Sequence, residues 1–120
     1  MTRERVLVVV HRSTAEGWER RDPVYAAATE ADGIAAGRLL KKLKKAERRY
    51  TRIIEFEDNP WEPDVPSTAR YTWGQVAHRI GLDCDVDIAG VKLSVCVAKV
   101  ASKLKDEGVR VRIKKQLTID

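Results

Sequence analysis

The stretch RVLVVVH at residues 5–11 decides how the rest of the chain is interpreted. Residues 6–10 form a continuous apolar run in which every side chain but Leu7 is a β-branched valine. Such side chains favour extended backbone. Strands buried on both faces show continuous apolar runs, whereas half-buried strands alternate apolar and polar residues. We therefore predict a first strand over residues 5–11 that is covered on both faces.

The segment after this strand is predicted to contain a loop and one long helix. Residues 13–22 are polar and are expected to form the loop. Asp22-Pro23 is typical of a helix start, and apolar residues at helical spacing predict a helix over residues 23–48. Gly33 and Gly37 weaken its middle, but their spacing would also let a neighbouring element approach closely. The expected apolar stripe is Ala28, Ala31, Ala35, Ala36, Leu39, Leu40, Leu43 and Ala46.

The second half of the chain begins with a strand predicted over residues 50–57, where side-chain character alternates. A proline-rich segment, residues 59–68, follows as a loop and a possible internal boundary. Next come a helix over residues 73–80, an acidic loop, a helix over residues 89–105 and a last strand over residues 109–117. The expected fold is therefore α+β: one domain, residues 1–120, with a small three-stranded sheet covered by helices on one face.

The sequence TWGQVAHRIGL at residues 72–82 resembles the first helix and turn of a helix-turn-helix. Small Ala77 would permit close helix packing, and Gly81 would allow the turn. The helix and strand that follow are similar to the recognition helix and wing of winged-helix proteins, so the resemblance covers residues 70–115. It implies DNA binding. A helix pair that packs on the sheet without nucleic acid is the alternative interpretation.

Charge supplies the main functional signal. The chain of 120 residues has a net charge of +5 and a pI near 9.4. Its basic excess is concentrated in residues 38–52, which hold eight cations and one acid, Glu47. A polyanion is the expected partner of such a run. The alternatives are cations that favour the negative end of a helix dipole, or pairing with the acidic block at residues 53–64.

The nucleic-acid hypothesis predicts a small binding protein, a regulator or accessory factor without chemistry of its own, with DNA favoured over RNA. Its predicted phosphate contacts lie in the basic block and on a second basic surface near the end of the chain. The first set is Arg38, Lys41, Lys42, Lys45, Arg48, Arg49 and Arg52. The second set is Lys92, Lys99, Lys103, Arg110 and Arg112.

Two other functions are carried as alternatives. Trp61 lies between prolines among acids, which is typical of protein contact, so a protein-interaction module or a homodimer is the second hypothesis. The third is a small nuclease or toxin that uses His11 or His78. We expect no metal site or cofactor, because the acidic loop lacks the calcium-loop glycine and glutamate, and the cysteines match no zinc pattern. With two cysteines and no apolar span, a cytoplasmic location is expected.

Overall fold

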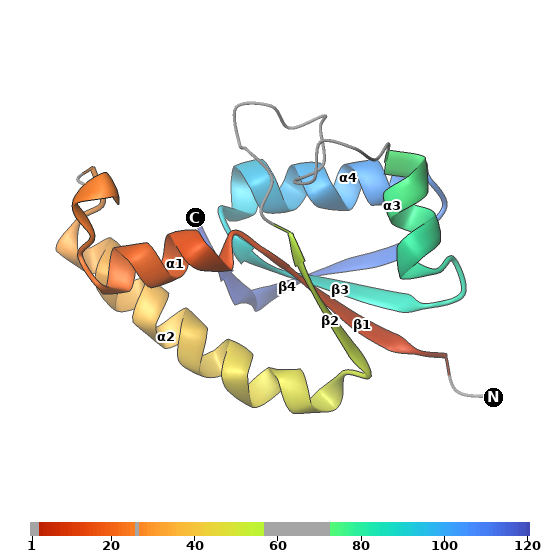
Figure 1. Ribbon diagram of the computed structural model, residues 1–120, viewed down its shortest axis with the longest axis horizontal. Helices are drawn as coiled ribbons and strands as arrows, with labels where there is room; N and C mark the ends of the chain where they lie inside the picture. Colours follow the sequence, from red (N-terminus) through yellow and green to blue (C-terminus); the bar gives the residue numbers. More distant parts are fainter. Residues whose placement is uncertain (1–2, 26, 57–72) are drawn as a thin grey trace.

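The structure is a computed structural model that describes residues 3–25, 27–56 and 73–120. Within these residues four strands alternate with helices along the chain (Figure 1). The strands are β1 (Arg5–Val10), β2 (Arg52–Phe56), β3 (Asp85–Val91) and β4 (Arg110–Ile119). The α-helices are α1 (Arg12–Glu19), α2 (Glu30–Ala46), α3 (Trp73–Ile80) and α4 (Ala98–Asp106). Short helical turns are η1 (Pro23–Tyr25), η2 (Glu47–Arg49) and η3 (Leu93–Val97).

The strands form one all-parallel sheet in the order β2-β1-β3-β4. Parallel neighbours need crossover connections, and helices supply them here. From the central strand β1 the chain passes to β2 at one edge, then returns across the sheet to β3 and β4. Helices α1 and α2 therefore cover one face, and α3 and α4 cover the other (Figure 1). The fold is mixed α/β.

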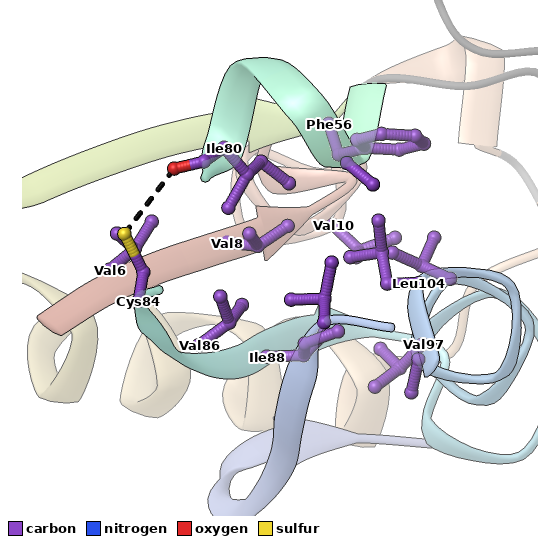
Figure 2. Packing of buried hydrophobic residues seen from close by; sticks show 14 of the residues in the cluster. Val6, Val8, Val10, Phe56, Ile80, Cys84, Val86, Ile88, Val97 and Leu104 are labelled. Carbon is purple, nitrogen blue, oxygen red and sulfur yellow. Dashed lines mark hydrogen bonds between the residues drawn. The ribbon is translucent and has the colours of Figure 1, made fainter. Parts of the chain in front are cut away.

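Two hydrophobic cores lie on opposite faces of the sheet and share β1. Val6, Val8 and Val10 pack with buried residues of α3 and α4, as Figure 2 shows for Ile80 and Leu104. The intervening residues of β1 face the other core, with Leu39 and Leu43 of α2. All five side chains of residues 6–10 are 0% exposed. The prediction that this strand is covered on both faces is confirmed.

The predicted three-stranded sheet with helices on one face is wrong, and so is the helix-turn-helix before the last strand. Residues 83–87 were expected to form a loop and residues 89–105 a helix. Instead, β3 (Asp85–Val91) lies between β1 and β4, and its residues 86–91 are buried. Two helices separated by a buried strand cannot make a helix-turn-helix. The chain is helical from Leu93 onward, and apolar residues of η3 and α4 join the core there.

The long helix predicted over residues 23–48 is also wrong at its start. Residues 12–19, expected to lie mostly in a loop, are helical. Helix α2 begins at Glu30, after its N-cap Thr29, whose hydroxyl accepts from the Asp32 backbone N–H in a capping box. The close approach expected at the two glycines is confirmed. A Cβ on Gly33 would lie 3.0 Å from the Trp18 carbonyl oxygen of α1, and one on Gly37 would meet a flexible side chain of α1. Helices α1 and α2 therefore pack with little space between their backbones.

The structural position of Trp61 and the possible boundary at residues 59–68 lie outside the described residues. Within the part of the chain that the structure describes, no helix is long and apolar enough to cross a membrane.

Candidate anion-binding site

The basic block, residues 38–52, lies in the second half of α2, in η2 and at the start of β2. Leu39 and Leu43 fix the buried side of α2. Lys42, Lys45 and Arg49 follow at helical spacing and share a different side, which is exposed. The burial of two leucines thus determines where three cations point.

These three cations meet two others from the sheet around one pocket of about 250 Å³, here called the cationic pocket. The others are Arg5, the first residue of β1, and Lys114 of β4. Five cations from four elements therefore line one hollow. The remaining lining residues are Ala46, Tyr50, Gln116 and Leu117, so no acidic side chain of the described residues lines it.

The single acid of the basic block does not neutralise the pocket. Glu47 pairs with Nη2 of Arg12, whose Nε lies 2.8 Å from Oε1 of Glu55. Both carboxylates are thus held by an arginine outside the block. Among the described residues, Lys42, Lys45, Arg49 and Lys114 form no ion pair. Pairing with Glu55 therefore does not account for these cations, and the later acids of that block lie outside the described residues.

Beside the pocket, a buried carboxylate holds Arg5 in place. Asp87 of β3 is 4% exposed and accepts a hydrogen bond of 2.6 Å from the Tyr50 hydroxyl. Burial and then the bond to Asp87 raise the pKa of Tyr50 to about 12, so this hydroxyl remains a donor at neutral pH. Arg5 stacks over the Tyr50 ring at 5.1 Å, and its Nη2 lies 3.7 Å from Asp87 Oδ2.

A second arginine reaches the same carboxylate from the edge strand. Arg112 of β4 donates from Nε to Asp87 Oδ1 at 3.2 Å and from Nη2 to Oδ2 at 3.4 Å. This hydrogen bond raises the pKa of Arg112. A bidentate contact of this kind fixes the plane of the guanidinium group. Asp87 therefore orients two arginines that remain exposed, with side-chain exposures of 47% for Arg5 and 66% for Arg112.

A second pocket, here called the arginine pocket, adjoins the first because Arg5 lines both. Its volume is about 370 Å³. Its charged lining comprises Arg5, Arg110, Arg112, Asp85 and Asp87. The cationic pocket and the arginine pocket together hold more cations than carboxylates. The arginine pocket is the more neutral of the two, because Asp85 and the buried Asp87 line it.

The other residues predicted in the basic block have different positions. Arg38, Lys41 and Arg48 are exposed but do not line the cationic pocket. Arg52 is a structural residue: its Nε lies 2.8 Å from Glu4 Oε1, and its Nη atoms donate to the carbonyl oxygens of Arg79 and Ile80. It thereby satisfies carbonyl groups at the end of α3.

The second predicted basic surface is not brought together. Arg110 and Arg112 alternate along β4 with residues of the α3/α4 core, so they share the α2 side of the sheet. Lys99 and Lys103 lie on α4, which covers the opposite face. Lys92 follows the carboxyl end of β3, whereas the arginine pocket lies at the amino end of that strand.

Sequence reasoning missed four residues of the site: Arg5, Tyr50, Asp87 and Lys114. A signal existed for Lys114, because it continues the alternation of Arg110 and Arg112 along one strand. No local signal marks Asp87. Its role depends on a strand register that places it opposite Leu7 and Arg112.

The carboxyl edge of the sheet holds His11, at the point where the connections from β1 and β3 leave in opposite directions. Open α/β sheets often bind ligands at such a switch point. His11 is buried there, and its backbone N–H donates to the Phe56 carbonyl oxygen at 2.9 Å. His78 is exposed in the last turn of α3, near the amino edge of β2. The structure therefore places the two histidines toward opposite edges.

No group of three or more histidine, cysteine or acidic side chains is arranged to hold a metal ion among the residues that the structure describes. Comparison with known proteins identifies no relative. The chain matches no protein-family model, and searches of curated proteins and of solved structures returned no significant match.

Proposed function

We propose that this protein binds nucleic acid through phosphate contacts in the cationic pocket, as a binding protein without chemistry of its own. The observation that carries the proposal is the convergence of Arg5, Lys42, Lys45, Arg49 and Lys114 on one hollow with no acidic lining residue in the described chain. Like charges brought together without acids cost free energy, which a bound polyanion offsets.

The helix-dipole alternative explains part of this charge. Cations in the last turn of α2 favour the negative end of the helix dipole. The dipole effect, however, does not depend on the side of the helix on which the cations lie, and it falls off within one turn. It gives no reason for Arg5 and Lys114 to come from two strands to the same pocket. Binding of a multiply charged anion accounts for both sources.

The proposed ligand chemistry is the phosphate group, which DNA and RNA share. The sequence-based preference for DNA depended on the helix-turn-helix, and β3 lies between the two helices of that motif. Phosphate contacts position a protein on nucleic acid without reading the bases. We therefore expect affinity that depends strongly on salt and weakly on sequence.

The test is fluorescence anisotropy with internally labelled single-stranded DNA, duplex DNA and RNA, each at two salt concentrations. The pocket variant is Lys42→Gln/Lys45→Gln/Arg49→Gln. The matched control is Lys41→Gln/Lys44→Gln/Arg48→Gln, which removes the same charge from the same segment outside the pocket. Each lost phosphate contact should flatten the log–log salt slope by roughly 0.7–0.9.

We expect the pocket variant to lose about two to three such contacts and the control to lose fewer. Equal losses in both variants would show that bulk charge, and not the pocket, attracts the ligand. An absence of salt-dependent binding to all three probes would refute the proposed function. Circular dichroism melts of both variants confirm that the comparison is made between folded proteins.

A further inference from the structure

We infer that the cationic pocket binds a terminal phosphate monoester of a nucleic acid chain in preference to the phosphodiesters of its backbone. This inference rests on the proposed function and specifies which chemical group enters the pocket. It follows from three features: the size of the hollow, its charge and the apolar part of its lining.

The first feature is the size of the hollow. A backbone that passes along a protein is usually followed by an open groove or a stripe of cations. Here the cations come from α2, η2, β1 and β4 and line one compact hollow of about 250 Å³. Drug-sized ligands occupy larger pockets, of roughly 300–1,000 Å³. A hollow of this size suits one end group of a chain.

The second feature is charge. Each phosphodiester carries one negative charge, whereas a phosphate monoester carries about −1.5 to −2 at neutral pH and has three acceptor oxygens. Five cations and no carboxylate of the described residues line the hollow. The monoester gains more from such a cluster, because its extra charge interacts with every cation that lines the pocket.

The third feature is the apolar part of the lining. Ala46, Leu117 and the ring of Tyr50 line the same pocket as the cations. The Tyr50 hydroxyl is already bonded to Asp87 and Arg5 lies over its ring, so the ring is held in place as part of this lining. An end nucleotide has a charged phosphate and a flat base with apolar faces. This division matches the charged and apolar parts of the lining.

The test compares three versions of one internally labelled single-stranded 12-mer: with a 5′-phosphate, with a 3′-phosphate, and with hydroxyls at both ends. We expect at least one phosphorylated probe to bind about tenfold more tightly than the hydroxyl-ended probe. Charge-assisted hydrogen bonds to the added oxygens provide this difference. A preference for one end identifies that end as the ligand, and equal preference shows that the monoester alone is recognised.

The matched pair of variants is Arg49→Gln and Arg48→Gln. The two arginines are adjacent in η2 and both exposed, but only Arg49 lines the pocket. We expect the preference for the phosphorylated probe to fall to within about twofold in Arg49→Gln and to persist in Arg48→Gln. Lys114→Gln tests the part of the lining that comes from β4 and should behave like Arg49→Gln.

Inorganic pyrophosphate provides the competitor. It should displace the phosphorylated probe, and failure to do so at any concentration would refute a pocket for terminal phosphate. Equal affinity for all three probes would overturn the terminal-phosphate inference and leave the proposed function standing. Binding of none of the probes would overturn the inference, and the titrations with duplex DNA and RNA then decide the proposed function. A preference that survives in Arg49→Gln and Lys114→Gln would place the terminal phosphate elsewhere and refute the inference.

Discussion

The substitution Asp87→Asn tests whether the buried carboxylate orients the neighbouring arginines or only lowers the local positive charge. It keeps the shape of the side chain and removes one negative charge beside a site proposed to bind polyanions. If net charge alone governed binding, the variant would bind nucleic acid more tightly, by the general electrostatic effect of an added positive charge. The orientation argument predicts the opposite sign.

The stability effect can be estimated from the contacts of Asp87. Its Oδ2 accepts the Tyr50 hydroxyl at 2.6 Å, and an amide oxygen can still accept that bond in neutral form. Hydrogen bonds to charged groups contribute about 1.5–3 kcal/mol and neutral ones about 0.5–1.5 kcal/mol, so the exchange costs about 1 kcal/mol. Differential scanning fluorimetry should therefore show a melting temperature lower by roughly 3–6 °C, given the size of the domain.

The affinity effect follows from Arg5 and Arg112. Asp87 holds both guanidinium groups in the free protein. Without it, their side chains must be ordered when the ligand binds, which weakens affinity roughly three- to tenfold. The measurement is anisotropy titration of the same oligonucleotide with wild type, Asp87→Asn and Asp85→Asn.

Asp85→Asn is the matched control for this experiment. Asp85 lines the arginine pocket on the same strand, but its side chain is 50% exposed and pairs with Arg3 at 2.9 Å. The control should bind nucleic acid as tightly as wild type or slightly more tightly. Tighter binding by Asp87→Asn, similar to that of the control, would refute the argument that the buried carboxylate positions the arginines.

Three further predictions concern the elements that support the site. Gly33→Ala should lower stability by about 1–2 kcal/mol in denaturant titration, because its Cβ meets the rigid Trp18 carbonyl at 3.0 Å; Gly37→Ala meets only a flexible side chain and should be neutral or stabilising. The pKa of Tyr50 is raised to about 12, so its contribution to stability is present below pH 10 and is lost as pH rises through 12; comparison of tyrosinate absorbance between wild type and Tyr50→Phe should show this late titration. Arg52→Gln should lower the melting temperature, because it removes the contacts with the end of α3, and should leave nucleic-acid affinity within about twofold.

The sequence predicted β1 well, but helices were predicted on only one face of the sheet. Both predictions depend on the same residues. Residues 6–10 indicated burial on both faces, and every one of them is fully buried. A strand of that kind requires helices on both sides of its sheet. The one-face architecture was inconsistent with this pattern, and the structure resolves the inconsistency by placing α1 and α2 on the second face. A loop was predicted where α1 lies because residues 13–22 are polar and include Gly17. In the structure, Gly17 belongs to α1 and packs against the Tyr25 ring.

The strand β3 could not be recognised locally, because its acids obscure its character. Asp85 and Asp87 occur in the sequence DCDVD, which is typical of a solvated turn. In the structure each is paired with an arginine from a distant part of the chain, Arg3 and Arg112 respectively. A buried carboxylate is tolerated only with such partners. The information that makes residues 85–91 a strand therefore lies in other segments of the chain.

The cations of β4 have one further explanation, which bears on how the site is interpreted. β4 is an edge strand, and charged side chains on edge strands prevent pairing with other chains. This protection accounts for the presence of Arg110, Arg112 and Lys114 on β4. It does not determine that Arg112 bonds to a buried carboxylate or that Lys114 shares a pocket with residues of α2. Protection of the edge requires only that the strand carry charged side chains. The arrangement around Arg5 requires in addition a specific strand register and a specific position for the end of α2. The convergence of the cations, and not their number, supports the proposed phosphate site.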